Sequence, residues 1–409
     1  MRHVIALSNG GPTVPARDGY LLGIYSAILV VWVIRGLLVY RGRRRLPVLH
    51  TGQCSLPEPS PLVSVVVPAR NERENIAEVI HTLLAQTYSP LEIVVVDDRS
   101  GDGTGELAER LATADERVQV LRVHHLPPGW TGKTHALAYG ANRARGSWLL
   151  FVDADTRHHP HHVRTLLQYA VGERADLVSI LPRLALGSFW ERVVQPYAAV
   201  LLMTLFRPQK VNDDRWRGHA FANGQCLLIR RDVYDQVGGH AAVRQCFVED
   251  IALARAVKRA GGRVRVVAAP DLMTTRMYTS LSGIVDGWAR IFYAATDRRL
   301  SALLALMTGI CLFSLTAPVG LALASVLAVT GNPAALVGLG LAAVHHLLIV
   351  TVMWPMYRLA RCAPWTLLFY PLACLVGLRI LWQATKLCFT HRVVWRGTAY
   401  DVELFQRAA

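Results

Sequence analysis

Between about residues 60 and 296, short apolar runs alternate with stretches whose apolar residues recur at helical spacing. The runs at 62–67, 91–96, 117–123 and 147–152 predict strands, and the stretches at 74–86, 104–112 and 133–144 predict helices. Most of these strands are apolar throughout instead of alternating, and helices separate them, which is typical of a parallel sheet covered on both faces. The pattern therefore predicts an α/β fold of the Rossmann-like, mostly parallel kind.

A different pattern precedes this region. Residues 20–40 are apolar apart from Arg35, and about 20 such residues suffice to cross a bilayer as a helix. Arg41 and three further arginines at 43–45 follow this run, where a signal peptide would have small residues at its cleavage site. We therefore predict one N-terminal transmembrane anchor, and the positive-inside rule places the segment after it in the cytoplasm.

Long apolar runs return near residue 300. Residues 303–329 and 334–354 can each span a membrane, whereas 365–382 is shorter and contains Arg379, so it is a third span or a helix in the interface. The basic tail at 391–400 favours a cytoplasmic end, and the number of spans, two or three, stays open. We predict an anchor region at 1–45, a cytoplasmic domain at 46–299 and a membrane region at 300–409. The expected location is the inner cell membrane, with several passes.

Composition supports a membrane protein more than a nucleic-acid-binding one. The chain has 44 Lys and Arg against 29 Asp and Glu, and 52% of its residues are hydrophobic. It has no zinc-finger spacing and no basic helix with base-reading residues, so no nucleic-acid partner is expected. Its seven cysteines form no CxxC motif, which argues against a disulfide framework.

Acidic residues gather where the predicted strands end. Pro68–Glu72 follows the first strand, Asp97 and Asp98 end the second, and Asp153 and Asp155 end the fourth. Ligands of such sheets bind beyond the carboxyl ends of the strands. Mg²⁺ is usually held by one or two carboxylates together with substrate phosphates. Asp153 and Asp155 therefore predict a clamp for Mg²⁺ or Mn²⁺ carrying a diphosphate.

Further residues suit the same chemistry. Lys133 stands at the start of a predicted helix, where the helix N-terminus favours anions. Asp250, next to Glu249, precedes another helix and is either its N-cap or a general base.

Two other segments allow competing interpretations. The histidines at 158–162 suggest a transition-metal site, but a helix that starts at Pro160 with a solvated first turn is favoured. Residues 186–206 form a buried core helix or, as we favour, an interfacial helix that helps to admit a lipid.

Several motifs together resemble the family 2 glycosyltransferases, which have the GT-A nucleotide-sugar-binding fold. These are "VSVVVPARNERENI", "IVVVDDRSGDGT", "GWTGKTHAL", "FVDADT", "ANGQCLLIRRDVYDQVGGH" and "VEDIALARAVKRAG", spread over residues 62–291. The middle motifs are most similar to the hopanoid-associated and carotenoid (diaponeurosporenoate-type) glycosyltransferases. The resemblance implies an inverting, divalent-metal-dependent enzyme that moves one sugar from a nucleotide-sugar donor to a hydroxyl of a polyisoprenoid-, hopanoid- or carotenoid-type lipid.

The resemblance also implies a role for each matching residue. The catalytic base would be Asp250, and the metal ligands would be Asp153 and Asp155. The donor would be held by Pro68, Arg70, Glu72, Asp97, Asp98, Lys133 and Asp153. The sugar or acceptor pocket would contain Asn223, Gly224, Gln225, Glu249, Trp288 and Arg290.

One motif departs from part of the family. Processive polysaccharide synthases carry QxxRW after the base, whereas this chain reads "IVDGWARIFY" there, with Trp288 and Arg290 in altered order. This favours a single transfer per acceptor. The remaining alternatives are a processive synthase of the same family and a non-catalytic membrane binding or transport protein that has kept the fold.

Overall fold

The computed structural model describes residues 16–43, 46–51, 56, 58–206, 208–246, 248–332, 335–390, 392–395 and 398–401. The chain divides into two compact units. One contains residues 1–40 and 309–352, and the other contains residues 41–308 and 353–409. Cys54 and two arginines of the predicted stop-transfer segment, Arg44 and Arg45, lie outside the described residues.

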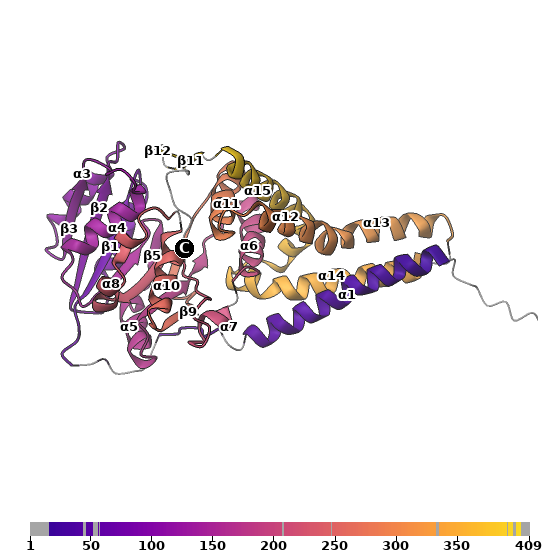
Figure 1. The fold of residues 1–409 in the computed structure, drawn as a ribbon, viewed down its shortest axis with the longest axis horizontal. Helices are drawn as coiled ribbons and strands as arrows, with labels where there is room; N and C mark the ends of the chain where they lie inside the picture. The colour runs from indigo at the N-terminus through magenta and orange to yellow at the C-terminus, as the bar shows by residue number, and fades with distance from the viewer. Residues whose placement is uncertain are drawn as a thin grey trace, which may run out of the picture. The chain divides into compact units, whose positions relative to one another are not determined.

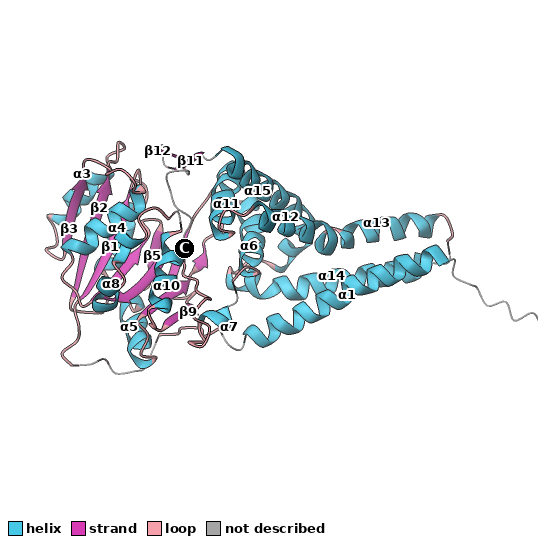
Figure 2. Ribbon diagram, viewed as in Figure 1, coloured by secondary structure: helices cyan, strands magenta, loops and turns pink. Residues whose placement is uncertain are grey.

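The larger unit is built on a sheet that, within the described residues, has seven strands in the order β3-β2-β1-β4-β8-β6-β9 (Figures 1 and 2). The strands pair in parallel except at β8, which runs antiparallel to both neighbours. The strands are β1 (Val63–Ala69), β2 (Leu91–Asp98), β3 (Val118–Val123), β4 (Trp148–Val152), β6 (Leu177–Leu181), β8 (Cys226–Arg230) and β9 (Val264–Ala268).

Helices cover both faces of this sheet because each strand carries apolar side chains on both sides. In β1, Val65 packs in one core cluster and Val66 in the opposite one, and neither is exposed. The first cluster includes α2 (Ile76–Leu84), α3 (Thr104–Ala112) and α5 (His162–Gly172); the second includes α4 (Gly132–Arg143), α8 (Arg231–Gln236) and α10 (Glu249–Arg259). The predicted α/β fold with a mostly parallel sheet is thus confirmed.

The order of the strands creates a switch point between β1 and β4. Strands β2 and β3 continue the sheet on one side of β1, and β4 lies on the other. At such a point the connections leave in opposite directions and open a crevice beyond the carboxyl ends of the strands. Because β8 is antiparallel to its neighbours, its amino-terminal end lies at the edge where the other strands have their carboxyl ends. The loop that precedes β8 therefore reaches the crevice.

Smaller elements complete this unit. A second sheet joins β5 (Thr156–His158), β10 (Met273–Thr275) and β7 (Arg183–Leu184), and two short helices are α7 (Pro208–Val211) and α9 (Gly239–Ala242). Near the C-terminus, β11 (Arg392–Trp395) pairs with β12 (Thr398–Asp401).

Helix α6 (Phe189–Met203) corrects our interpretation of residues 186–206. It packs on α11 (Leu281–Ala295) and α15 (Tyr370–Thr390), and most of its residues are buried. A capping box of Ser188 and Glu191 fixes its start. Pro196 removes one backbone donor, yet the helix continues through it. The helix is therefore a packed element of the larger unit, with Phe189 at its exposed end.

Four helical segments in the described part of the chain are long and apolar enough to cross a membrane. They are residues 23–42 within α1 (Ala16–Arg43), 300–329, 335–359 and 364–390. The second contains α12 (Leu300–Gly309), the π-helical turn η1 (Ile310–Ser314) and α13 (Thr316–Val329); the third is α14 (Ala335–Leu359); the fourth joins the 3₁₀ turn η2 (Pro364–Phe369) to α15.

A polar cluster links the helices of the smaller unit. His345 is fully buried, and its ring nitrogens lie 3.1 Å from the Tyr25 hydroxyl and 3.0 Å from the Phe313 carbonyl oxygen. Trp32 donates its indole N–H to the same carbonyl. A π-helical turn leaves carbonyls without their usual helical donor, and this explains how Phe313 can accept from other helices. His345 therefore joins three segments of this unit, α1, η1 and α14.

Candidate active site

A cavity of about 540 Å³ opens beyond the carboxyl ends of β1, β2 and β4 in the larger unit. Its polar lining comes from separate parts of the chain, which the fold brings to one edge. Thirteen of the predicted site residues lie on its wall: Pro68, Arg70, Glu72, Asp98, Lys133, Asp153, Asp155, Asn223, Gly224, Gln225, Glu249, Asp250 and Arg290.

The loops after β1 and β2 form the first part of the wall. Arg70 lies 3.6 Å from the buried carboxylate of Asp98, which also accepts hydrogen bonds from the Arg99 guanidinium. Glu72 is held by its backbone N–H, which donates to Thr104, and by its carboxylate, which accepts from Asn75. These contacts fix polar groups on the wall of the cavity.

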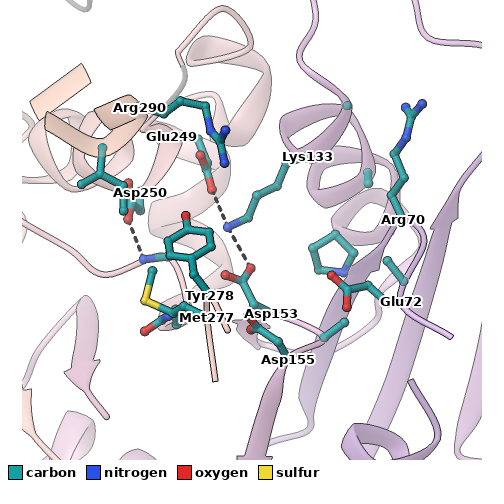
Figure 3. Close-up of a pocket in the computed structure, with 18 of the residues that line it drawn as sticks. Arg70, Glu72, Lys133, Asp153, Asp155, Glu249, Asp250, Met277, Tyr278 and Arg290 are labelled. Atoms are coloured by element: carbon teal, nitrogen blue, oxygen red, sulfur yellow. Dashed lines mark hydrogen bonds and ion pairs between the residues drawn. The ribbon is translucent and has the colours of Figure 1, made fainter. Parts of the chain in front are cut away.

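Lys133 lies at the centre of the cavity (Figure 3). It is in the first turn of α4, where the Thr131 side chain caps the helix by accepting from the backbone N–H of Thr134. Its ammonium group lies 2.8 Å from Asp153 Oδ1 and 3.1 Å from Glu249 Oε1. Burial disfavours the charged form of Lys133, but these carboxylates raise its pKa well above the usual value. Lys133 thus links the loop after β4 to the start of α10.

Asp250 is partly buried on the opposite side of the cavity. Its Oδ2 accepts a hydrogen bond from the backbone N–H of Gly224 at 2.5 Å, and its Oδ1 accepts from Ile251 at 2.8 Å. Burial and the adjacent Glu249 carboxylate raise the pKa of Asp250 to about 7, although Lys133 and the two N–H groups act in the opposite direction. The N-cap interpretation is wrong, because the N-cap of α10 is Val248 and Asp250 lies within its first turn.

The loop before β8 approaches Asp250 closely because it contains Gly224. A Cβ at this position would lie 3.0 Å from Asp250 Oδ2 and 3.3 Å from Lys133 Nζ. On either side, Asn223 donates to Gln225 and to the Ile180 carbonyl, and Gln225 donates to Thr275. The loop is therefore tied to β6 and β10 and presents its backbone to the carboxylate.

Sequence reasoning missed Tyr278 and Met277, which also line the cavity. Tyr278 hydrogen-bonds Arg290 and packs against the backbone of α11, where a Cβ on Gly287 would lie 2.1 Å from its ring. Gly287, about one helical turn before Arg290, is the only feature of the local sequence that relates to this contact. A glycine alone does not indicate which side chain packs against it.

Two predicted residues lie outside this cavity. Asp97 is buried at the end of β2, where it accepts from the backbone of Ser100 and lies 3.8 Å from Arg122. Trp288 lines a separate, more apolar cavity beside Asp250. The donor role of Asp97 stays a prediction, although its contacts are those of a residue that shapes the turn.

Two of the four histidines at 158–162, His158 and His162, form part of a buried network beneath the loop of Asp153 and Asp155, whereas His159 and His161 are exposed. His158 and His162 are stacked, with their Nδ1 atoms 2.8 Å apart, and His162 contacts Cys226. Burial lowers the pKa of His162 to about 3. The first turn of α5 is therefore not fully solvated as expected, because His162 points inward.

The charges on the cavity wall leave an excess of negative charge. Six carboxylates face three basic side chains, and a diphosphate would add further negative charge. Among the described residues no group of three or more His, Cys, Asp or Glu side chains could hold a metal ion. Asp153 and Asp155 still suit Mg²⁺ or Mn²⁺, because two carboxylates with phosphate oxygens form a common binding mode for such ions.

Comparison with known proteins agrees with this geometry. Residues 64–238 match the family model for glycosyl transferase family 2, a range that spans the loops of β1, β2 and β4 and the loop before β8. The chain carries a family 2 glycosyltransferase domain. This glycosyltransferase is 26% identical to the 4,4'-diaponeurosporenoate glycosyltransferase of Staphylococcus aureus over 276 residues, or 66% of this chain and 70% of that protein.

A solved structure supports the fold of this glycosyltransferase. The mannosyltransferase from Pyrobaculum calidifontis, in complex with GDP-mannose and Mn²⁺, superposes with a TM-score of 0.50 at 19% identity. The match covers 81% of this chain and 99% of that one. At this identity the likeness shows the GT-A fold, as the sequence predicted.

Proposed function

We propose that this glycosyltransferase moves one sugar from a nucleotide-sugar donor to a hydroxyl group of a lipid, with inversion at the anomeric carbon. The observation that carries the proposal is the position of Asp250. This partly buried carboxylate lies on the wall of both the acid-rich cavity and the apolar cavity beside it. A base that is reached from a polar and an apolar side fits a water-soluble donor and an amphipathic acceptor.

The donor side of the reaction follows from the loops of β1, β2 and α4. Pro68, Arg70, Glu72 and Asp98 hold the nucleoside, and the N-terminus of α4 with Lys133 faces the diphosphate. The Lys133 ammonium then moves from its carboxylate partners toward the phosphate oxygens. The mannosyltransferase solved with GDP-mannose and Mn²⁺ supports donor chemistry of this kind, and the relative named for diaponeurosporenoate supports a lipid acceptor.

The acceptor side depends on Asp250. With a pKa near 7, its carboxylate is ionised in a substantial fraction of molecules at neutral pH and is basic enough to accept a proton. The acceptor hydroxyl donates its proton to Asp250, and its oxygen attacks the anomeric carbon from the side opposite the nucleoside diphosphate. The bond between sugar and phosphate breaks, and the diphosphate leaves with the electron pair.

Asp153 and Asp155 would hold a divalent ion, which supplies charge neutralisation at the leaving diphosphate. Treatment with EDTA should abolish transfer, and Mn²⁺ or Mg²⁺ should restore it. Asp155→Asn should raise the metal concentration needed for half-maximal activity. A purified enzyme that is equally active in EDTA would contradict this assignment.

The decisive test of the function is the variant Asp250→Asn. Full-length protein is purified in detergent and supplied with radiolabelled UDP- and GDP-sugars and a total lipid extract. We expect a labelled glycolipid with wild type and a loss of about 100-fold or more in Asp250→Asn, as for removal of a general base. Asp232→Asn, at an exposed carboxylate on α8, is the control and should retain activity. Unchanged turnover in Asp250→Asn would refute the mechanism.

A further inference from the structure

The last apolar segment, residues 364–390, differs from the other candidate spans in the described part of the chain. Within its most apolar stretch, 50% of the residues are buried inside the protein, against 6% for residues 23–42. It also belongs to the larger unit, whereas residues 1–40 and 309–352 form the smaller one. Its packing is therefore that of an element of the larger unit, although its length and composition permit a crossing.

One face of α15, the main helix of this segment, packs on α11 and α6, and Figure 1 shows α15 running beside α11. This face consists of small, apolar or weakly polar side chains: Ala373, Cys374, Val376, Gly377, Ile380, Leu381, Ala384 and Thr385. The partner helix α11 carries Asp286, which is exposed. If α15 crossed a bilayer in this packing, it would bring that carboxylate toward the hydrocarbon, where a charge is costly.

The opposite face of α15 presents five exposed residues, which we call the α15 stripe: Leu375, Arg379, Trp382, Lys386 and Phe389. They are alternately four and three residues apart, so they lie along one side of the helix. Leu375 and Trp382 are each 55% exposed, and Phe389 is 69% exposed. Large apolar side chains that lie together on a surface in this way mark a contact with a protein or a membrane.

The charges of this region favour a membrane surface as the partner. Residues 353–390 contain four basic residues and no acidic one. Arg379 lies near the middle of the segment, and it would face hydrocarbon if α15 crossed a bilayer, because the other face is packed. At the membrane surface, it reaches lipid phosphates instead. Lys386 does the same beside Trp382, whose ring lies 6.0 Å from its ammonium group. Basic residues next to aromatic ones are typical of helices that lie in the interface.

The connection to α14 places the start of the segment near the membrane. Helix α14 ends at Leu359 and η2 begins at Pro364, so the two ends lie at most about 18 Å apart, at about 3.5 Å per residue. Trp365 and Phe369 of η2 are exposed, and the ring of Phe369 lies 5.2 Å from that of Phe189 at the start of α6. A chain that leaves the bilayer at the end of α14 thus enters an aromatic cluster suited to the interface.

We propose that residues 364–390 lie in the plane of the membrane instead of crossing it, and that the α15 stripe binds the anionic headgroups of the leaflet next to the catalytic domain. The two basic residues of the stripe contact lipid phosphates, and its three apolar residues enter the upper part of the acyl chains. Because α6 and α11 also line the apolar cavity beside Asp250, this contact sets the height of that cavity above the bilayer. The chain then crosses the membrane three times.

Depth-dependent quenching tests the orientation of the helix. Full-length protein, with its native cysteines replaced by serine, carries an NBD label at Leu375→Cys, Trp382→Cys or Phe389→Cys. It is placed in nanodiscs whose lipids bear a nitroxide near the headgroup or near the chain end. We expect the headgroup nitroxide to quench all three labels more strongly. Leu336→Cys and Leu347→Cys on α14 are the controls, and only the label at 347, in the middle of that helix, should be quenched more by the deep nitroxide.

Three results of this experiment would overturn the inference. A deep label at 375 together with a shallow one at 389 would show that the helix crosses the bilayer. Labels that neither nitroxide quenches would show that the stripe faces water or is covered by protein, such as a second copy of the chain. A label at 347 that is not deep would refute the membrane region itself, and the inference with it.

Charge variants test the class of lipid. For a label at Phe389→Cys, phosphatidylglycerol with a headgroup-proximal nitroxide should be enriched over the same form of phosphatidylcholine by about fivefold for each basic residue of the stripe. Arg379→Gln/Lys386→Gln should remove this preference. Arg110→Gln/Arg164→Gln, at two exposed basic residues on α3 and α5, removes the same charge and should keep it. No preference in the wild type, or an equal loss in both double variants, would contradict the proposal.

These measurements are independent of the proposed function. They need neither a sugar donor nor an acceptor, and thermal unfolding shows that each variant is folded. A chain without transferase activity would still give the expected quenching pattern, and a crossing helix would leave the proposed reaction in place.

Discussion

The partly buried carboxyl group of Asp250 has two neighbours that determine when it can act as a base. Glu249 raises its pKa by repulsion, and Lys133 lowers it by attraction, while burial favours the neutral acid. Because Lys133 is itself held by Asp153 and Glu249, the proton affinity of the proposed base depends on residues that we propose to face the donor. In the proposed mechanism, donor binding and acceptor activation would therefore be electrostatically linked through one ammonium group.

The pH dependence of transfer follows from this arrangement. The base acts only when ionised, so kcat/KM should rise by about tenfold per pH unit below about pH 7 and level off above it. Glu249→Gln removes a negative charge that raises the pKa of Asp250, and the rise should move to lower pH. Initial rates from pH 5 to 9 measure both profiles. Identical profiles for the two proteins would exclude Glu249 from this role.

Individual residues could be predicted from the sequence when their position depended on a strand end. Asp98 and Asp153 follow apolar strands, and the carboxyl ends of parallel strands meet at one edge of a sheet, so their convergence could be inferred. Tyr278 could not be found in this way, because it lies in a loop after a short strand of the second sheet. Its position depends on packing against Gly287, which no local pattern indicates.

At the scale of elements, the short strand β5 supports the loop that presents Asp153 and Asp155. The Thr156 hydroxyl donates to the Asp153 carbonyl at 2.6 Å and lies 2.9 Å from His158 Nε2. His158 continues through His162 to Cys226 on β8. A chain of buried contacts thus ties the acidic loop to the reversed strand.

Removing the Thr156 hydroxyl should loosen this support. Thr156→Val leaves buried polar atoms on Asp153 and His158 without a partner, which should reduce the free energy of unfolding by about 1–3 kcal/mol. It should also raise the Mn²⁺ concentration needed for activation. Thermal unfolding and metal titration measure the two effects. Thr274→Val on the paired strand β10 is the control, and an equal effect there would contradict the specific role of Thr156.

The strands and helices from β1 to β4 were predictable because each has a complete local pattern. The cavity between α6, α11 and α14 could not be predicted from the sequence. Its walls come from apolar segments that lie far apart in the chain. An apolar helix has the same sequence pattern whether it faces a core, a bilayer or a ligand. This is why α6 was assigned to the interface although it is mostly buried.

At the scale of the whole molecule, four helical segments have the length and composition of membrane spans. The arginines at 41–45, at the end of α1 and directly after it, favour a cytoplasmic catalytic domain by the positive-inside rule. We propose that residues 46–299 form this domain and that the segments from residue 300 onward belong to the membrane region. If the two spans after the domain cross once each, the turn between them lies on the opposite side of the membrane.

Cysteine labelling in intact cells tests this topology. Gly331→Cys, in the turn after α13, should react with a membrane-impermeant maleimide added outside. His125→Cys, in an exposed loop of the catalytic domain, should react only after lysis. The native cysteines are replaced by serine in both. The opposite pattern of labelling would reverse the orientation of the chain.

The reversed strand β8 has a consequence for how the nascent chain folds. Strand β4 is apolar throughout and pairs with β1 on one side, but its partner on the other side begins only at Cys226. Until residues 153–225 have been synthesised, the hydrogen-bonding edge of β4 is open, and an exposed apolar edge invites aggregation. Truncated chains that end before β8 should therefore be insoluble. Nascent chains are therefore prone to aggregate until β8 has been synthesised. An N-terminal anchor inserted early in the bilayer would keep neighbouring chains apart during this time.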